Sequence, residues 1–136
     1  MGEGSTPFLH ALSAELKEPR PIASYEHNPI YATAFDPLRM PWHETHCVTS
    51  YDEVPVRPCG LLFVDHAPAL RRIVDLWRFA SVAECVVVHD WGHGMYRYSK
   101  IKPLYRYRAV DTSLIPYTAI LSNFVDVTTW IPSTSP

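Results

Sequence analysis

Proline sets the strongest constraint on what this chain can fold into. The 136 residues include 13 prolines, about twice the average frequency, and more than half of them lie between residues 19 and 60. Proline interrupts helices and is excluded from the middle of sheets, so this distribution predicts short elements joined by fixed turns. For residues 19–60 it predicts a proline-rich N-terminal arm, which either lies extended on a partner or contains short hidden strands.

Length and composition point to one soluble domain. The chain has room for a single domain, residues 1–136, with a helix and the arm in residues 1–60 and a β-rich core in residues 61–136. The apolar share of 47% can fill that core. A net charge of −2 gives no overall electrostatic reason to bind nucleic acid or an anionic membrane. The apolar runs are too short to span a bilayer and no secretory signal is recognised, so we expect a cytoplasmic protein without a membrane span.

The cysteines argue against a disulfide scaffold, because they are odd in number and contain no CxxC pair, as is typical of a reducing compartment. His43 and His46, with Cys47 and Cys59, are nevertheless ligand types that zinc takes. The two histidines would share a face on a helix but not on a strand, and the surrounding residues favour extended chain. Surface or interface histidines are therefore the preferred interpretation.

Hydrophobic periodicity predicts two amphipathic helices. The first begins at Thr6 and Pro7, a helix-start pair, and ends before Pro19. The second opens at Pro68. Apolar residues recur at helical spacing in both and are expected to form the buried faces: Phe8, Leu9, Leu12 and Leu16 in the first helix, and Leu70, Ile73, Val74 and Trp77 in the second.

Short runs of β-branched and aromatic residues predict a series of strands after Gly60. They favour a mostly β fold with minor α: an antiparallel β-sandwich or partial jelly roll with one or two short helices and the proline-rich arm. Val86, Val88, Tyr105 and Val127 are expected to face a shared interior. The expected strands are residues 61–64, 82–88, 95–101, 104–110, 117–121 and 124–130.

Residues 86–93, which read Val-Val-Val-His-Asp-Trp-Gly-His, are the first candidate for chemistry. The adjacent His89 and Asp90, extended by His93, offer imidazole and carboxylate ligands for a divalent cation. The pair follows a β-branched run and precedes a glycine turn. The simpler interpretation is a strand-end turn in which Asp90 caps backbone amides.

Metal phosphohydrolases of the HD type use such a His-Asp pair with an upstream histidine and a downstream aspartate. His66 can be nominated for the first role, and Asp111 or Asp126 for the second. That family is all-helical, however, and the periodicity around this pair is that of a strand.

Two runs, residues 96–102 and 105–108, interleave tyrosines with basic residues. Such patterns can stack on bases and pair with phosphates. On a strand, alternation places the tyrosines on one face and the basic residues on the other. An outer face carrying Arg97, Arg106 and Arg108 could still contact RNA or an acidic partner.

Residues 69–88, in which Trp77-Arg78 leads from a helix into a strand, resemble a segment of picornavirus-like capsid proteins. Residues 123–133 are similar to a later strand of the same jelly roll, which tends to read Val-x-Val-x-x-Pro-x-x-Ser. The resemblance covers residues 69–136 and implies a coat component. An eight-stranded jelly roll needs further strands beyond the second motif, so it implies a small or partial component, or a partner that supplies them.

The sequence contains no GxSxG, no glycine-rich phosphate loop and no carboxylates paired at helical spacing. We therefore assign no catalytic residue and expect no cofactor. The leading hypothesis is a structural or interaction protein that assembles with other copies or related chains, most specifically a viral coat-type component of a virion. The alternatives are a small metal-dependent hydrolase that uses the His-Asp site, and an RNA-binding β domain.

Overall fold

The structure is a computed structural model that describes residues 5–34 and 40–131. Their contacts divide the chain into two compact units, Met1–Pro55 and Val56–Pro136. This division falls close to the expected step from arm to core at residue 60. Strands and helices contribute in similar measure, so the fold is mixed α/β with a β-rich character.

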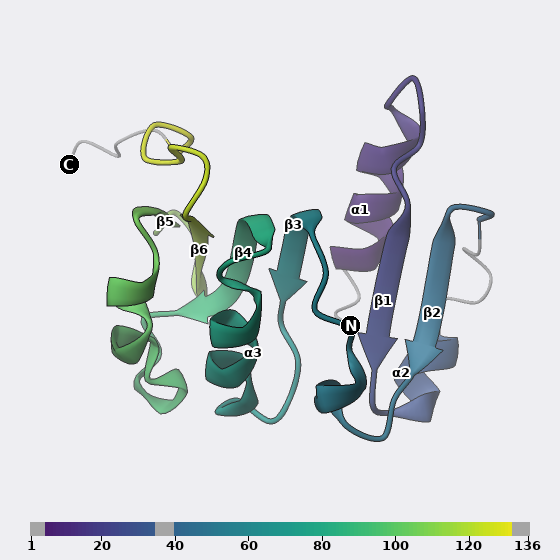
Figure 1. The fold of residues 1–136 in the computed structure, drawn as a ribbon, viewed down its shortest axis with the longest axis horizontal. Coiled ribbons are helices and arrows are strands. Elements are labelled where there is room, and N and C mark those ends of the chain that lie inside the picture. Colours follow the sequence, from purple (N-terminus) through teal and green to yellow (C-terminus); the bar gives the residue numbers. More distant parts are fainter. Residues whose placement is uncertain (1–4, 35–39, 132–136) are drawn as a thin grey trace. The chain divides into compact units, whose positions relative to one another are not determined.

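Within the first unit, the segment expected to be an arm contains regular structure. Pro19 and Pro21 precede strand β1, and Pro41 precedes strand β2, so the prolines lie outside the strands as their missing amide requires. β1 and β2 pair in parallel, from Ile22 opposite His43 to Glu26 opposite Cys47 (Figure 1). The elements are α1 (Ser5–Ala14), β1 (Ile22–Glu26), α2 (Pro29–Thr33), β2 (His43–Cys47) and the 3-10 turn η2 (Tyr51–Glu53).

Helix α1 forms where expected but buries the opposite face. Of the four residues expected to dock, Phe8 is 65% exposed, Leu12 and Leu16 also lie in solvent, and Leu9 is half-buried. The buried residues of this helix are polar: Thr6, His10 and Ser13. Ser13 Oγ bonds the backbone carbonyl and amide of Arg20, which fixes the chain where it leaves the helix.

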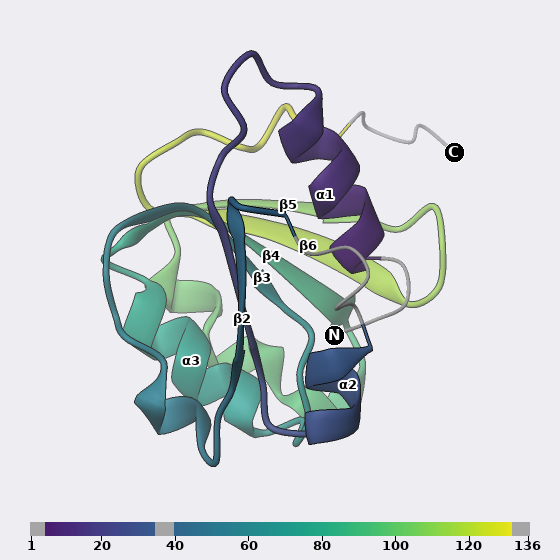
Figure 2. The same cartoon turned by 90° about the vertical axis from the view of Figure 1, so that its right-hand side faces the viewer.

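The second unit is built on a four-stranded sheet in the order β3-β4-β6-β5, with helix α3 packed against it (Figures 1 and 2). Three consecutive 3-10 turns connect β4 to β5. The elements are β3 (Cys59–Val64), α3 (Arg71–Phe79), β4 (Ala83–Trp91), η3 (Gly94–Tyr96), η4 (Tyr98–Lys100), η5 (Lys102–Leu104), β5 (Tyr107–Asp111) and β6 (Tyr117–Ser122).

The expectation of antiparallel pairing is right for part of this sheet only. β6 runs antiparallel to both β4 and β5, but β3 and β4 are parallel. The reason is the helix between them: two strands joined by a helical crossover return in the same direction, whereas strands joined by a tight turn reverse. The sheet is therefore mixed. A sandwich or jelly roll requires two sheets packed face to face, and that part of the expectation stays a prediction.

The interior of the sheet unit confirms the four residues expected to face it. Val86, Val88 and Val127 are fully buried, and Tyr105 is nearly so. The Tyr105 hydroxyl donates to the backbone carbonyl of Leu76 at 2.8 Å. This hydrogen bond links the segment just before β5 to α3. Cys85 is also buried and free, as expected of a small core residue.

Two expected strands are wrong. Residues 95–101 form 3-10 turns because Arg97 adopts a left-handed backbone with φ of 51°, which breaks an extended run. Residues 124–130 follow β6 as turns and irregular chain, with backbone amides of Phe124 and Val125 bonded to Ser122 Oγ. Residues 132 and 133 of the capsid-like motif lie outside the described residues.

Helix α3 also reverses its predicted orientation. Of the predicted face, the N-cap residue Leu70, Val74 and Trp77 are exposed and Ile73 is half-buried. The buried residues of the helix are Arg72, Asp75, Leu76 and Phe79. No helix within the described residues is long and apolar enough to cross a membrane.

Candidate functional site

The candidate site lies where the two parallel strands end. β3 and β4 are paired in register up to Val64 opposite Val88, so the next residues along each strand, Asp65 and His89, emerge at the same edge of the sheet. In open α/β sheets, the edge at the carboxyl ends of parallel strands is where ligands bind. The topology therefore places ionisable side chains at a favourable edge.

A β-bulge brings the next residue of β4 to the same place. β4 and β6 pair as Val88 with Ala119 and then as Trp91 with Tyr117. Two residues of β4, His89 and Asp90, thus stand opposite one residue of β6. In a regular strand the two side chains would point to opposite faces, but a bulge redirects them. Asp90 has φ of 62°, in the left-handed region that aspartate tolerates better than most residues.

Asp65, His89 and Asp90 consequently form a compact group. His89 Nδ1 lies 3.5 Å from Asp65 Oδ1 and 3.4 Å from Asp90 Oδ1. One ligand atom from each residue lies within 4.8 Å of the other two, and within residues 5–34 and 40–131 this is the one group that could hold a metal ion. A cation with ligands about 2.0–2.5 Å away needs donor atoms separated by about 3–5 Å. The three donors fit a divalent cation.

Arg72 of α3 holds the two carboxylates in place. Its guanidinium lies 3.1 Å from Asp65 Oδ1 and donates to Asp90 Oδ2 at 3.0 Å. Its Nε donates to the backbone carbonyl of His66 at 2.7 Å. The side chain is almost fully buried; burial alone lowers its pKa, but Tyr98 and the two carboxylates outweigh that effect and raise it. Arg72 therefore stays charged and compensates the carboxylates.

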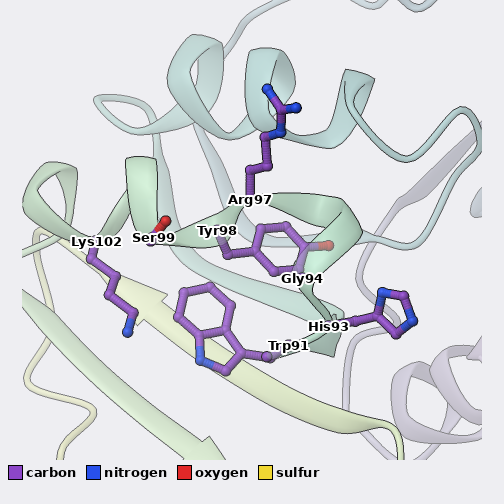
Figure 3. A pocket seen from close by; sticks show the side chains of 8 residues that line it. Trp91, His93, Gly94, Arg97, Tyr98, Ser99 and Lys102 are labelled. Carbon is purple, nitrogen blue, oxygen red and sulfur yellow. The ribbon is translucent and has the colours of Figure 1, made fainter.

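An aromatic stack supports this guanidinium. Arg72 lies over the Tyr96 ring at 4.5 Å, Tyr96 stacks on Tyr98 at 5.4 Å, and Tyr98 stacks on Trp91 at 5.0 Å. Figure 3 shows the Tyr98 and Trp91 rings lying face to face beside the short turns that follow β4. The cation–π contact and the parallel rings together restrict where Arg72 can go.

Asp90 and the nearby Asp75 are held ionised. Burial raises the pKa of Asp90, but hydrogen bonds from Tyr96 and Arg72 lower it by more, so it lies below its ordinary value. Burial likewise raises the pKa of Asp75, yet hydrogen bonds from His66, Arg71 and Arg78 bring it down to about 2. Perturbed carboxylates of this kind are common at functional sites, although structural ion pairs produce them too.

A cavity of about 230 Å³ opens beside the group. His89 lines it together with Asp111, one of the two aspartates nominated for the downstream role. Hydrogen bonding from Ser113 to the Asp111 carboxylate lowers the pKa of Asp111. The remaining lining residues are Leu114, Ile115, Pro116 and Thr118, from the loop between β5 and β6 and the start of β6.

Other residues nominated from the sequence are placed elsewhere. His93 lies outside the three-residue group: its Nδ1 accepts from the amide of Met95 and caps the turn η3. Asp126 is exposed and bonds Thr128. His66 does not join the three ligands but contacts Asp75, with Nε2 at 2.9 Å from Oδ2. Of the nominated set, the structure brings His89 and Asp90 together and adds Asp111 at the adjoining cavity.

The zinc and nucleic-acid candidates are separated. His43 is buried on β2, whereas His46 stacks on Tyr25, since residues three apart on a strand face opposite sides. Arg106 and Arg108 are exposed on and beside β5. Arg97 instead lines a second cavity of about 190 Å³ with Trp91, and Figure 3 shows its side chain extending away from the indole. RNA contact by these arginines stays a prediction.

The first unit contains a hydrogen-bonded chain that the sequence did not reveal. His10 Nε2 contacts His43 Nδ1, and His43 Nε2 contacts Ser24 Oγ at 2.8 Å. The tautomers decide which atom donates in each contact. These hydrogen bonds join α1, β1 and β2. We assign them a packing role because both histidines are buried.

Asp65 and Arg72 are the two residues of the site that sequence reasoning missed. A usable signal was present: Asp65 directly follows an apolar run, and the next strand ends at His89. Had the intervening helix been taken as a crossover, the two strands would have been predicted parallel with their ends adjacent.

No protein-family model, curated protein or solved structure matches this chain. The fold and site define a mixed α/β protein with a candidate metal centre at the carboxyl edge of two parallel strands.

Proposed function

We propose that this protein is a metal-dependent enzyme whose centre is the group Asp65, His89 and Asp90. The single observation that carries the proposal is the convergence of three ligand atoms from two strands, brought about by the bulge in β4. The metal site predicted from the sequence consisted of His89, Asp90 and His93, and the proposed centre has Asp65 in place of His93. The bulge and the left-handed Asp90 support it, since such local backbone features concentrate at functional sites.

The donor set favours an oxygen-preferring cation. Two carboxylates and one imidazole suit Mg²⁺ or Mn²⁺ better than the thiolate-rich sets typical of structural zinc. A bound divalent cation would act as a Lewis acid on an oxygen atom and lower the pKa of a coordinated water or hydroxyl group. Hydrolysis is the form of this chemistry in which the activated oxygen belongs to water.

The residues of the chain would share the remaining tasks. Asp65 and Asp90 would neutralise the cation, and Arg72 would fix their orientation while balancing part of their charge. Tyr96 and Tyr98 would keep Arg72 in place. The cavity beside His89 would admit the substrate to the open side of the centre.

Manganese binding tests this proposal directly. We expect the purified chain to bind one Mn²⁺, measured by titration calorimetry and by loss of the free-ion electron paramagnetic resonance signal. Asp65→Asn should weaken binding about tenfold or more, because it removes one charged ligand. Asp126→Asn is the matched control: it removes an exposed carboxylate from the same unit and should leave affinity unchanged. Equal affinities for the two variants, or no binding by the native chain, would contradict the proposal.

A structural or interaction role is the second candidate, and a specific observation favours it. Helix α3 exposes Leu70, Val74 and Trp77, which repeat at i, i+4 and i+7 and form one stripe. An apolar stripe in solvent is typical of a surface that binds another chain. Its most specific form, a coat-type component with a β-sandwich or partial jelly roll, would additionally require a second sheet facing the first.

A further inference from the structure

The loop between β5 and β6 gives the cavity beside His89 an unusual lining. Leu114 and Ile115 are 76% and 87% exposed, which makes Ile115 the most exposed large apolar residue of the described chain. Both line the cavity with Pro116, whereas Asp111 and Thr118 provide its polar side. Water-exposed apolar side chains beside a polar group favour a ligand that has both kinds of surface.

The charges around the cavity argue against a polyanionic ligand. Asp65 and Asp90 contact one guanidinium, that of Arg72, and Asp111 adds a third carboxylate in the lining of the cavity. With a divalent cation bound, the positive and negative charges balance. A phosphate ester would add negative charge to a site without a spare cation among the lining residues, and like charges at close range repel.

We infer that the substrate of this centre is a small molecule with at most one negative charge that presents oxygen donors to the metal and an apolar body to Leu114, Ile115 and Pro116. The inference rests on the proposed metal function and adds the chemical class of its ligand. The cavity of about 230 Å³ is below the usual range for drug-sized ligands, which limits the apolar body to roughly one ring or a short branched chain. Asp111 would accept a hydrogen bond from a hydroxyl group of the same molecule.

Two hydroxamic acids provide a matched pair of probes. Acetohydroxamic and benzohydroxamic acid offer the same two oxygen donors, and they differ in carrying a methyl group or a phenyl ring. With Mn²⁺-loaded native chain, we expect benzohydroxamic acid to bind about tenfold more tightly or better, because its phenyl ring removes more apolar surface from water than the methyl group does. Binding of both to free Mn²⁺ provides the correction for intrinsic chelation. Inorganic phosphate is a third probe and should bind more weakly than benzohydroxamic acid.

A variant of the loop locates the effect. Leu114→Ser with Ile115→Ser removes two side chains that are mostly in solvent, so the fold should be retained. It should abolish the preference for benzohydroxamic acid and leave the affinities for Mn²⁺ and acetohydroxamic acid unchanged. Retention of the preference, its absence in the native chain, or tightest binding of phosphate would each overturn the inference while Mn²⁺ binding still supports the metal centre. Failure of Mn²⁺ to bind would overturn both.

Discussion

At the scale of single residues, α3 buries two charged side chains, Arg72 and Asp75, beside the apolar Leu76 and Phe79. Asp75 is almost completely buried and contacts Arg71, Arg78 and His66, with the Arg78 contact at 2.7 Å. A buried carboxylate needs such partners, because an unpaired one would cost several kcal/mol of desolvation. Of these contacts, the one with His66 links Asp75 to the segment before α3, whereas Arg71 and Arg78 lie on the same helix.

The low pKa of Asp75 makes stability depend on pH in a defined window. Its pKa is about 2 in the folded protein and 3.8 for an ordinary aspartate, so stability rises with pH wherever the unfolded chain binds the proton and the folded chain does not. This contribution, about 2 kcal/mol, is fully present above pH 3.8 and is lost as the pH falls toward 2. Urea unfolding from pH 7 to pH 2 measures it.

Asp75→Asn should lower the free energy of unfolding at pH 7 by about 2 kcal/mol or more, because Arg71, Arg78 and His66 lose their contacts with a buried carboxylate. The difference from the native chain should shrink between pH 4 and pH 2. Glu84→Gln, which removes an exposed carboxylate from β4, is the control and should have little effect. A pH-independent difference would mean that Asp75 acts by packing alone.

At the scale of elements, the bulge in β4 decides whether a site exists at all. Without the extra residue, Asp90 would stand on the face of the sheet opposite to His89. The bulge requires a left-handed residue, and Asp90 supplies it. Asp90 therefore has two roles: it is the left-handed residue of the bulge and a ligand of the candidate metal centre.

Two substitutions at this position separate those requirements. Asp90→Ala and Asp90→Gly both remove the carboxylate, and only glycine adopts a positive φ without steric cost. We expect the alanine variant to be less stable than the glycine variant by about 1 kcal/mol, measured as the difference in free energy of unfolding. Equal stabilities would indicate that the bulge relaxes to a regular strand when Asp90 is lost.

The helices illustrate where sequence patterns mislead. Periodicity correctly predicted helices near residues 5–14 and 71–79, because backbone propensity and helix-start residues act locally. The buried faces were predicted wrongly, since apolar spacing shows which residues lie on one side but not which side meets the sheet. On α3, Arg72 contacts Asp90 and Asp75 contacts His66, and both contacts join the inner face of the helix to residues outside it.

At the scale of the whole molecule, the exposed stripe of α3 has a consequence for association. If Leu70, Val74 and Trp77 bind another chain, the protein should associate as its concentration rises. Light scattering after size exclusion should show a mass above 15.5 kDa at high concentration, and Trp77→Ser should reduce it. Phe124→Ser is the matched control, because Phe124 and Trp77 are both 56% exposed. A native chain that stays monomeric at high concentration would count against the assembly role.

The sequence by itself determined the positions of β3, β4 and β6, the inward orientation of Val86 and Val88, and the candidacy of His89 and Asp90. Those features depend on local propensity and on alternation along a single strand. Only the tertiary structure decided that β3 and β4 are parallel, that Asp65 and Arg72 meet the His-Asp pair, and that His93 does not. These results depend on contacts between residues far apart in the chain. Their geometry is set by the crossover helix, which local patterns predict as a helix but not as a connection between paired strands, and by one bulge, which has no reliable signature in a single sequence.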